Sequence, residues 1–142
     1  MDNLLYLIKQ NKNNRLLILG TTCSGKSTLA EKIENTLDMD KLVFPFLSQN
    51  DKEYVCRKPW TEEIGRYMAK LVNERIKIVK GKPLFGTVLL DSDFIIYLSI
   101  NDQLLKERCG KRSVNFIDAK NMQGYIKKSI MNSGISYTEI NI

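Results

Sequence analysis

The sequence contains no histidine, and this absence narrows the chemistry that is open to the chain. A side chain that transfers a proton here must be a carboxylate, a lysine, a cysteine or a tyrosine, with water as the remaining route. Hydrolases whose nucleophile is activated by a histidine base are therefore excluded.

Cysteine is scarce as well. Cys23, Cys56 and Cys109 are odd in number and widely spaced, and none of them has a second cysteine two residues away. Such spacing matches neither a disulfide framework nor a zinc-binding pattern. We expect free thiols in a reducing compartment, which indicates the cytoplasm.

Long hydrophobic runs are also missing. The N-terminal stretch MDNLLYLIKQ has only five consecutive apolar positions, Leu4 to Ile8, after an acidic second residue. A membrane span needs about 20 such residues, and the core of a secretory signal needs about 7–15. We therefore expect neither a signal peptide nor a membrane partner.

The remaining composition is typical of one globular domain. A chain of 142 residues with 43% hydrophobic and 27% charged residues lies near the commonest domain size and composition. The sequence shows no repeat, no linker and no low-complexity tract that would divide it. We therefore expect a single domain over residues 1–142.

The charge balance is basic but dispersed. The formal net charge is +6, which favours anionic partners, yet no long basic block occurs along the chain. Small phosphorylated molecules and nucleic acid both fit this bias, so charge alone does not choose between them.

Hydrophobic patterning predicts alternating strands and helices. Continuous apolar runs such as RLLILGT (15–21) and FIIYLSI (94–100) are typical of strands covered on both faces of a parallel sheet. Residues 83–90 are predicted as a connection, because a crossover between neighbouring parallel strands needs about a dozen residues. The expected strands are 15–21, 41–47, 75–81, 94–100 and 135–142, and the expected helices are 2–12, 26–37, one from Thr61, one from Asn101 or Asp102, and 116–133. This order predicts an α/β fold in three layers, with a parallel sheet of about five strands between helices.

The stretch GTTCSGKST, residues 20–28, carries the clearest chemical signal. It contains the pattern G-x-x-x-x-G-K-[ST] between a predicted strand and a predicted helix, which is the context that the motif requires. The glycines let successive amide groups point at phosphate oxygens, and the helix adds the positive end of its dipole. Lys26 would bind the β- and γ-phosphates, and the Ser27 hydroxyl would join the coordination of Mg²⁺.

The predicted cofactors are therefore ATP and Mg²⁺. Within the loop, Cys23 occupies a variable position, and Thr28 is expected to begin the helix or to contact the α-phosphate. The nucleotide-binding residues predicted from this loop are Gly20, Thr21, Thr22, Cys23, Ser24, Gly25, Lys26, Ser27 and Thr28, with Lys26 also catalytic and Ser27 also the metal ligand.

On these residues the chain resembles a known group of enzymes. ILGTTCSGKSTLAEKI, residues 18–33, is similar to the opening of the small P-loop kinases, which include nucleoside monophosphate kinases, shikimate kinase and gluconate kinase. The resemblance implies the P-loop NTPase fold and a phosphotransferase activity.

A second segment resembles one member of that group. KIVKGKPLFGTVLLDSDFIIYLSI, residues 77–100, is similar to part of the cytidylate kinases, and Lys82 stands where that family carries an arginine of its nucleotide site. The resemblance implies that Lys82 binds substrate and that the acceptor is CMP or dCMP, although Pro83 replaces the family's aspartate. The positions that fit the family are Gly81, Gly86, Thr87, Val88, Asp91, Asp93, Ile96 and Leu98.

Two arginines follow this segment. Arg108 and Arg112 are four residues apart in LLKERCGKR, on one helix face or at the edge of a loop. The family resemblance implies a lid here whose arginine neutralises charge on the transferred phosphoryl group. The alternative is an ordinary solvated basic surface.

The acceptor is expected between the second predicted strand and the helix from Thr61. Asp51 would accept a hydroxyl proton or help to hold Mg²⁺, and Arg57 would clamp an acceptor phosphate or carboxylate. Both are equally consistent with plain surface charges. Trp60 and Tyr67 lie nearby, and we expect them to pack in the helix rather than to stack on a base.

An acidic residue is missing where one is expected. P-loop kinases place a metal-binding acid at the end of a strand next to the loop, but Lys80 and Gly81 end the strand predicted at 75–81. Asp91 or Asp93 would have to substitute for it in space.

The sequence thus predicts ATP- and Mg²⁺-dependent phosphoryl transfer to a small acceptor, with a nucleoside monophosphate as the first candidate. A nucleoside or another small metabolite is the rival within the same class. The basic charge keeps a polynucleotide 5′-hydroxyl kinase or an RNA-associated protein open, and the missing acid keeps a non-catalytic nucleotide sensor open.

Overall fold

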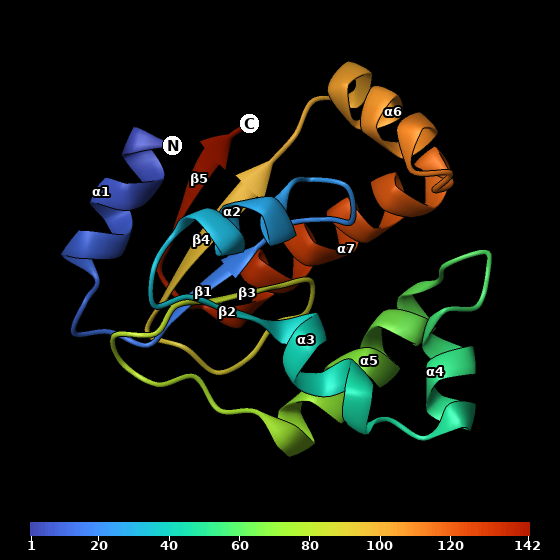
Figure 1. Ribbon diagram of the computed structural model, residues 1–142, viewed down its shortest axis with the longest axis horizontal. Coiled ribbons are helices and arrows are strands. Elements are labelled where there is room, and N and C mark those ends of the chain that lie inside the picture. The colour runs from blue at the N-terminus through green and yellow to red at the C-terminus, as the bar shows by residue number, and fades with distance from the viewer.

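A computed structural model describes residues 1–142 as one α/β layer structure (Figure 1). Its five-stranded sheet is parallel throughout, with the order β2-β3-β1-β4-β5, which confirms the predicted architecture. The strands are β1 (Leu16–Leu19), β2 (Leu37–Asp38), β3 (Leu84–Gly86), β4 (Phe94–Ser99) and β5 (Tyr137–Asn141). The helices are α1 (Asp2–Gln10), α2 (Lys26–Lys32), α3 (Met39–Val43), α4 (Gln49–Val55), α5 (Glu62–Arg75), α6 (Asp102–Lys111) and α7 (Phe116–Ser133), with a 3-10 turn, η1 (Phe44–Phe46).

Both faces of the sheet are buried at the central strands β1, β3 and β4. Successive residues of a strand point to opposite sides, so each of these strands contributes to both faces. In β1, Leu16 and Ile18 pack with Leu4 of α1 and Ile33 at the end of α2. The neighbouring residues of the same strand join a second and larger core under α5 and α7. The apolar run of β1 is therefore the axis of the domain.

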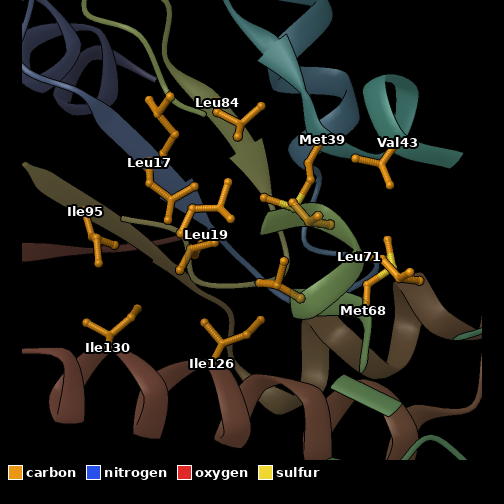
Figure 2. Close-up of a cluster of buried hydrophobic side chains, with 14 of the residues drawn as sticks. Leu17, Leu19, Met39, Val43, Met68, Leu71, Leu84, Ile95, Ile126 and Ile130 are labelled. Atoms are coloured by element: carbon orange, nitrogen blue, oxygen red, sulfur yellow. The ribbon is translucent and has the colours of Figure 1, made fainter. Parts of the chain in front are cut away.

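Figure 2 shows the larger core. Ile126 and Ile130 point from α7 toward the sheet, and Met68 and Leu71 reach the same cluster from α5. Met39 of α3 is fully buried there. This packing fixes α3 and α5 beside the carboxyl ends of the strands, where ligands bind in open parallel sheets.

The strand predicted at 41–47 is wrong, since this segment forms α3 and η1. The Asp38 side chain accepts a hydrogen bond from the amide of Asp40 at 3.0 Å and so caps α3. Pro45 then lies at the start of the 3-10 turn, where its missing amide is harmless. The second strand of the structure is β2, which has two residues and lies between α2 and α3.

The strand predicted at 75–81 is also wrong, and the segment predicted as a connection contains the real strand, β3. β3 does not neighbour β4, because β1 lies between them. β3 is three residues long, and residues 87–93 connect it to β4 without a helix. The minimum of about a dozen residues holds for a crossover between neighbouring parallel strands, so it did not exclude a strand here.

The other predicted elements are confirmed with shifted bounds. Thr61, Asn101 and Asn115 each cap a helix with a side-chain oxygen, which explains why α5, α6 and α7 begin where the sequence indicates. α2 ends at Lys32, five residues earlier than predicted. None of these helices combines the length and the apolarity that a membrane crossing requires.

Candidate active site

The predicted phosphate-binding loop connects β1 to α2 at the carboxyl edge of the sheet. Gly25, directly before α2, has a φ of 95°, a conformation that favours glycine. A Cβ at Gly20 would lie 2.7 Å from Oγ of Ser24, so the start of the loop also requires a glycine. Both glycines fit the tightly curled backbone that the motif predicts for a phosphate-binding loop.

Two hydrogen bonds hold this loop to the rest of the fold. The buried Thr21 hydroxyl donates to the carbonyl of Ala119 in α7 at 2.6 Å. The amide of Gly20 donates to the carbonyl of Gly86 at the end of β3 at 3.2 Å. The loop is therefore fixed from two sides before any ligand arrives.

Lys26 lies at the mouth of the loop without an ionic partner. Its Nζ donates to the carbonyl of Thr21 at 2.7 Å and lies 3.4 Å from Oγ of Ser24. Loss of solvent around the half-buried ammonium lowers the pKa of Lys26 to about 8, although Asp40 and Asp38 act in the opposite direction. A cation held in this way is suited to an incoming anion.

Two carboxylates that the sequence reasoning missed face the loop. Asp38 ends β2 and accepts a hydrogen bond from the Ser27 hydroxyl at 3.3 Å. Asp40 lies in the first turn of α3 and lines the same cavity. Although Asp40 is exposed as a residue, partial loss of solvent around its carboxyl group and the charge of Asp38 raise its pKa, while Lys26 lowers it.

The pair formed by Ser27 and Asp38 fits a magnesium ion. Both groups supply oxygen, and Mg²⁺ in proteins is usually held by one or two carboxylates together with substrate phosphates and water. Their hydrogen bond shows that both side chains already reach the same point. The strand next to β1 ends at Gly86 and Thr87 without an acid, so Asp38 is the carboxylate in place for this role.

A cavity of about 230 Å³ joins the loop to the helices beyond it. Its walls come from the loop, the ends of β2 and β3, and the helical segments α3 to α5 and α7. The lining residues are Thr22, Cys23, Gly25, Lys26, Ser27, Thr28, Asp38, Asp40, Phe44, Val55, Cys56, Trp60, Ile64, Gly65, Met68, Gly86, Thr87, Val88, Arg112, Met122 and Tyr125.

A second cavity of about 460 Å³ lies on the other side of the loop, between α2 and α6. It carries a strongly basic lining and no acid. The residues are Cys23, Ser24, Gly25, Thr28, Leu29, Lys32, Arg108, Lys111, Arg112 and Ile142. A nucleotide whose phosphates occupy the loop has room for its remaining parts here.

The two predicted lid arginines differ in their contacts. Arg108 donates from Nη1 to the carbonyl of Ser24 at 3.0 Å and lines only the second cavity. Arg112, at the end of α6, is exposed and lines both cavities. Arg108 thus supports the loop from outside, whereas Arg112 is placed between the two compartments.

Three predicted substrate ligands do not line the cavity. Asp51 accepts a hydrogen bond from the Tyr67 hydroxyl at 2.6 Å. The Arg57 guanidinium lies 5.2 Å from the centre of the Tyr54 ring. Lys82 is exposed at the amino end of β3, on the opposite edge of the sheet from the loop, so the structure gives it no contact with a substrate held there.

Asp91 and Asp93, the alternative acids, are also at the opposite edge. Both bind the Arg15 guanidinium, at 2.9 Å and 3.0 Å. They cannot replace a metal-binding acid near Ser27.

Trp60 and Tyr67 were both predicted to pack in the helix, but their surroundings in the structure differ. Tyr67 packs edge-on against Tyr54, as expected for a helix-packing residue. Trp60 instead lines the cavity, together with Tyr125 of α7, with ring centres 5.7 Å apart. No local pattern indicates this pair, because 65 positions separate the two residues and only the packing of α5 on α7 joins them.

Comparison with known proteins supports the fold. No family model matches the sequence, and no curated protein matches it. Among solved structures, the chain is similar to a deoxyadenosine kinase from M. mycoides with the product dCMP and a flexible dCDP bound. The TM-score is 0.53 and the identity 14%, over 88% of each chain. At this identity the likeness establishes a P-loop kinase fold and leaves the resemblance to nucleoside monophosphate and cytidylate kinases as a prediction.

Proposed function

We propose that the protein transfers the γ-phosphoryl group of ATP to a hydroxyl of a small acceptor, with Mg²⁺ as cofactor. One observation carries the proposal: Lys26, Ser27, Asp38 and Asp40 line one cavity at the mouth of a phosphate-binding loop. A phosphate loop alone indicates nucleotide binding. The Asp40 carboxylate in the same cavity adds the group that an acceptor hydroxyl requires.

The donor is held by the loop. Its amides and Lys26 bind the β- and γ-phosphates, and Ser27 with Asp38 holds the metal ion. Mg²⁺ supplies charge neutralisation on the phosphate oxygens when it is bound. The basic second cavity, with Arg108 on its wall, takes the part of the nucleotide beyond the phosphates.

The acceptor hydroxyl is placed next to Asp40. Its oxygen attacks the γ-phosphorus, the bond from that phosphorus to the bridging oxygen breaks, ADP leaves, and the hydroxyl proton passes to the Asp40 carboxylate. Asp40 lines the same cavity as Lys26 and Ser27, which puts its carboxylate within the site for this role. Arg112, between the two cavities, neutralises charge on the phosphoryl group in transit.

The comparison supports the donor chemistry more than the acceptor. A deoxyadenosine kinase shares the fold, so a nucleotide-dependent phosphotransferase is consistent with it. A nucleoside monophosphate, a nucleoside and another hydroxylated metabolite would all use the same residues at the loop.

The test is ADP formation from ATP and Mg²⁺ with a panel of nucleosides, nucleoside monophosphates, sugars and 5′-hydroxyl oligonucleotides. We expect Asp40→Asn to lower kcat by about 10²–10⁴-fold, the usual contribution of a general base, while ATP still binds. Asp38→Asn should instead raise the magnesium concentration needed for half-maximal rate. Asp2→Asn, on the distant α1, is the matched control and should leave both unchanged.

Two outcomes would overturn parts of this proposal. Full turnover by Asp40→Asn would remove the carboxylate from the mechanism. ATP binding by the wild-type protein without ADP release for any acceptor would identify a nucleotide sensor instead of an enzyme.

A further inference from the structure

We propose that the acceptor is an uncharged hydroxyl compound with a flat ring, of the nucleoside class, and that acceptors already carrying a phosphate or carboxylate are disfavoured. The inference rests on the proposed function and specifies the acceptor at the same site. It departs from the nucleoside monophosphate predicted from the sequence.

The wall of the cavity away from the loop is apolar and aromatic. Six side chains from four structural segments form most of it, and all are half-buried or buried in the ligand-free protein. They are Phe44, Trp60, Ile64, Met68, Met122 and Tyr125. Such a lining favours an apolar ring over a chain of hydroxyl groups, because each hydroxyl removed from water would lack a partner.

The two largest rings of this wall are held close to α5 by a glycine. A Cβ at Gly65 would lie 2.8 Å from the Trp60 ring and 3.1 Å from the Tyr125 ring. The rings therefore meet edge to face directly against the helix backbone. Because both rings also line the cavity, a third flat ring held there would pack against this pair.

The charges of the cavity favour a neutral acceptor. Asp38 and Asp40 are its acids, and Lys26 and Arg112 are its cations. Both cations belong to the donor side, since Lys26 binds the loop carbonyl of Thr21 and Arg112 also lines the second cavity. A phosphate on the acceptor would meet the Asp40 carboxylate with no free cation to offset it.

Three cations on or beside the acceptor helices, Arg57, Arg66 and Lys128, have partners outside the cavity. Arg57 lies over the Tyr54 ring and does not line the cavity. Arg66 and Lys128 both lie near Glu62, at 4.0 Å and 3.0 Å. Recognition of an anionic acceptor normally uses such a cation in a charge-assisted hydrogen bond. The structure offers none on this wall.

One consequence concerns the product. Transfer converts a neutral acceptor into an anion, which the same carboxylates then repel. We therefore expect one phosphoryl group per acceptor, and no second transfer to the product.

The single tryptophan of the chain, Trp60, gives a direct test. Its fluorescence is titrated with each deoxynucleoside and with the matching 5′-monophosphate, with equilibrium dialysis as a second measure of binding and ADP release measured in parallel. We expect the best nucleoside to bind at least about tenfold more tightly than its own monophosphate, a difference of about 1.4 kcal/mol.

A variant that adds a positive charge makes the test sharper. Cys56 is exposed and lines the acceptor side, so Cys56→Arg adds a cation with little risk to the fold. We expect it to strengthen monophosphate binding at least fivefold and to leave nucleoside binding within about twofold. Cys56→Gln, with a neutral side chain of similar reach, is the control and should leave the preference unchanged.

The outcomes separate this inference from the proposed function. Tighter binding or faster phosphorylation of a monophosphate overturns the inference and leaves the kinase intact. A nucleoside preference without ADP release overturns the kinase and leaves the ligand class standing. No binding of any nucleoside in either assay overturns the inference.

Discussion

The charged residues at the two edges of the sheet differ in whether they form ion pairs. At the amino edge, Arg15 binds Asp91 and Asp93, and its amide also donates to Asp93 at 2.7 Å. These contacts with Arg15 lower the pKa of Asp93 below its usual value. At the carboxyl edge, Lys26 and Asp40 lie near each other without an ion pair, and both have pKa values shifted toward their neutral forms.

This difference separates structural charges from charges that await a ligand. At the amino edge, Arg15, Asp91 and Asp93 are partners of one another within the chain. At the carboxyl edge, Lys26 and Asp40 are partly desolvated and lack an ion-pair partner. Such charges are typical of sites where a ligand supplies the missing partner. The comparison explains why Asp91 and Asp93 belong to the fold and Asp38 and Asp40 to the proposed site.

The largest effect is expected from Lys26→Met. Turnover should fall by about 10³-fold or more, because the cation on the transferring phosphates is lost. The pKa of Lys26 is lowered from 10.5 to about 8, so the folded state disfavours its proton and stability should rise between these two pH values. We therefore expect the thermal midpoint at pH 7 to stay the same or increase, measured beside the surface control Lys127→Met. A clear drop in the midpoint would show that Lys26 is structural.

The next largest effects are expected from the two arginines at α6, one on kcat and the other on the KM for ATP. Arg112→Ala should lower kcat by about 10²-fold with a small change in the KM for ATP, because the side chain lies between the cavities and supports nothing else. Arg108→Ala should mainly raise that KM, since it loses the bond to Ser24. Steady-state kinetics on both variants decides this. Equal effects on both parameters in the two variants would reject the division of roles.

A smaller effect is expected where the backbone positions the carboxylates. A methyl group at Gly86 would overlap the buried side chain of Met39, which lies between Asp38 and Asp40. Gly86→Ala should therefore lower stability by about 1–3 kcal/mol and reduce turnover several-fold. Chemical denaturation in a double-mutant cycle with Met39→Ala provides the check. The loss should shrink when Met39 is already truncated, and strictly additive losses would contradict the contact.

The smallest effect on activity is expected at the amino edge. Asp93→Asn should leave kcat and KM unchanged and lower the thermal midpoint at neutral pH. Because the folded pKa of Asp93 is lowered, its contribution is present above the usual value of 3.8 and is lost as pH falls through the lowered value. The midpoints of wild type and variant should therefore converge as the pH falls below that lowered pKa. A constant gap across pH would assign the loss to something other than charge.

Much of the fold was predictable because its signals are local. The phosphate-binding loop follows from its glycines, and Thr61, Asn101 and Asn115 mark helix starts that each depend on one side chain. Runs such as residues 94–100 are apolar throughout because both faces of the sheet are covered. In each case the residues that determine the element lie within it.

The missed features depend on contacts between distant segments. β2 has two residues and exists only through its pairing with β3, so no pattern within it announces a strand. Placing the second strand at 41–47 hid Asp38 and Asp40 and directed attention to Asp51, while the resemblance to cytidylate kinases directed it to Lys82. The signal that was available is the spacing Asp-x-Asp, with Asp38 also suited to cap a helix. Its meaning required knowing that a strand ended there.

The hydrogen bond from Thr21 to Ala119 means that α7 contacts both the loop and the cavity. About one turn beyond Ala119, the same helix presents Met122, and then Tyr125, to the opposite compartment. One helix thus supports the predicted phosphate-binding loop at one point and forms a wall of the cavity at another. A tilt of α7 would therefore displace both the loop and this wall.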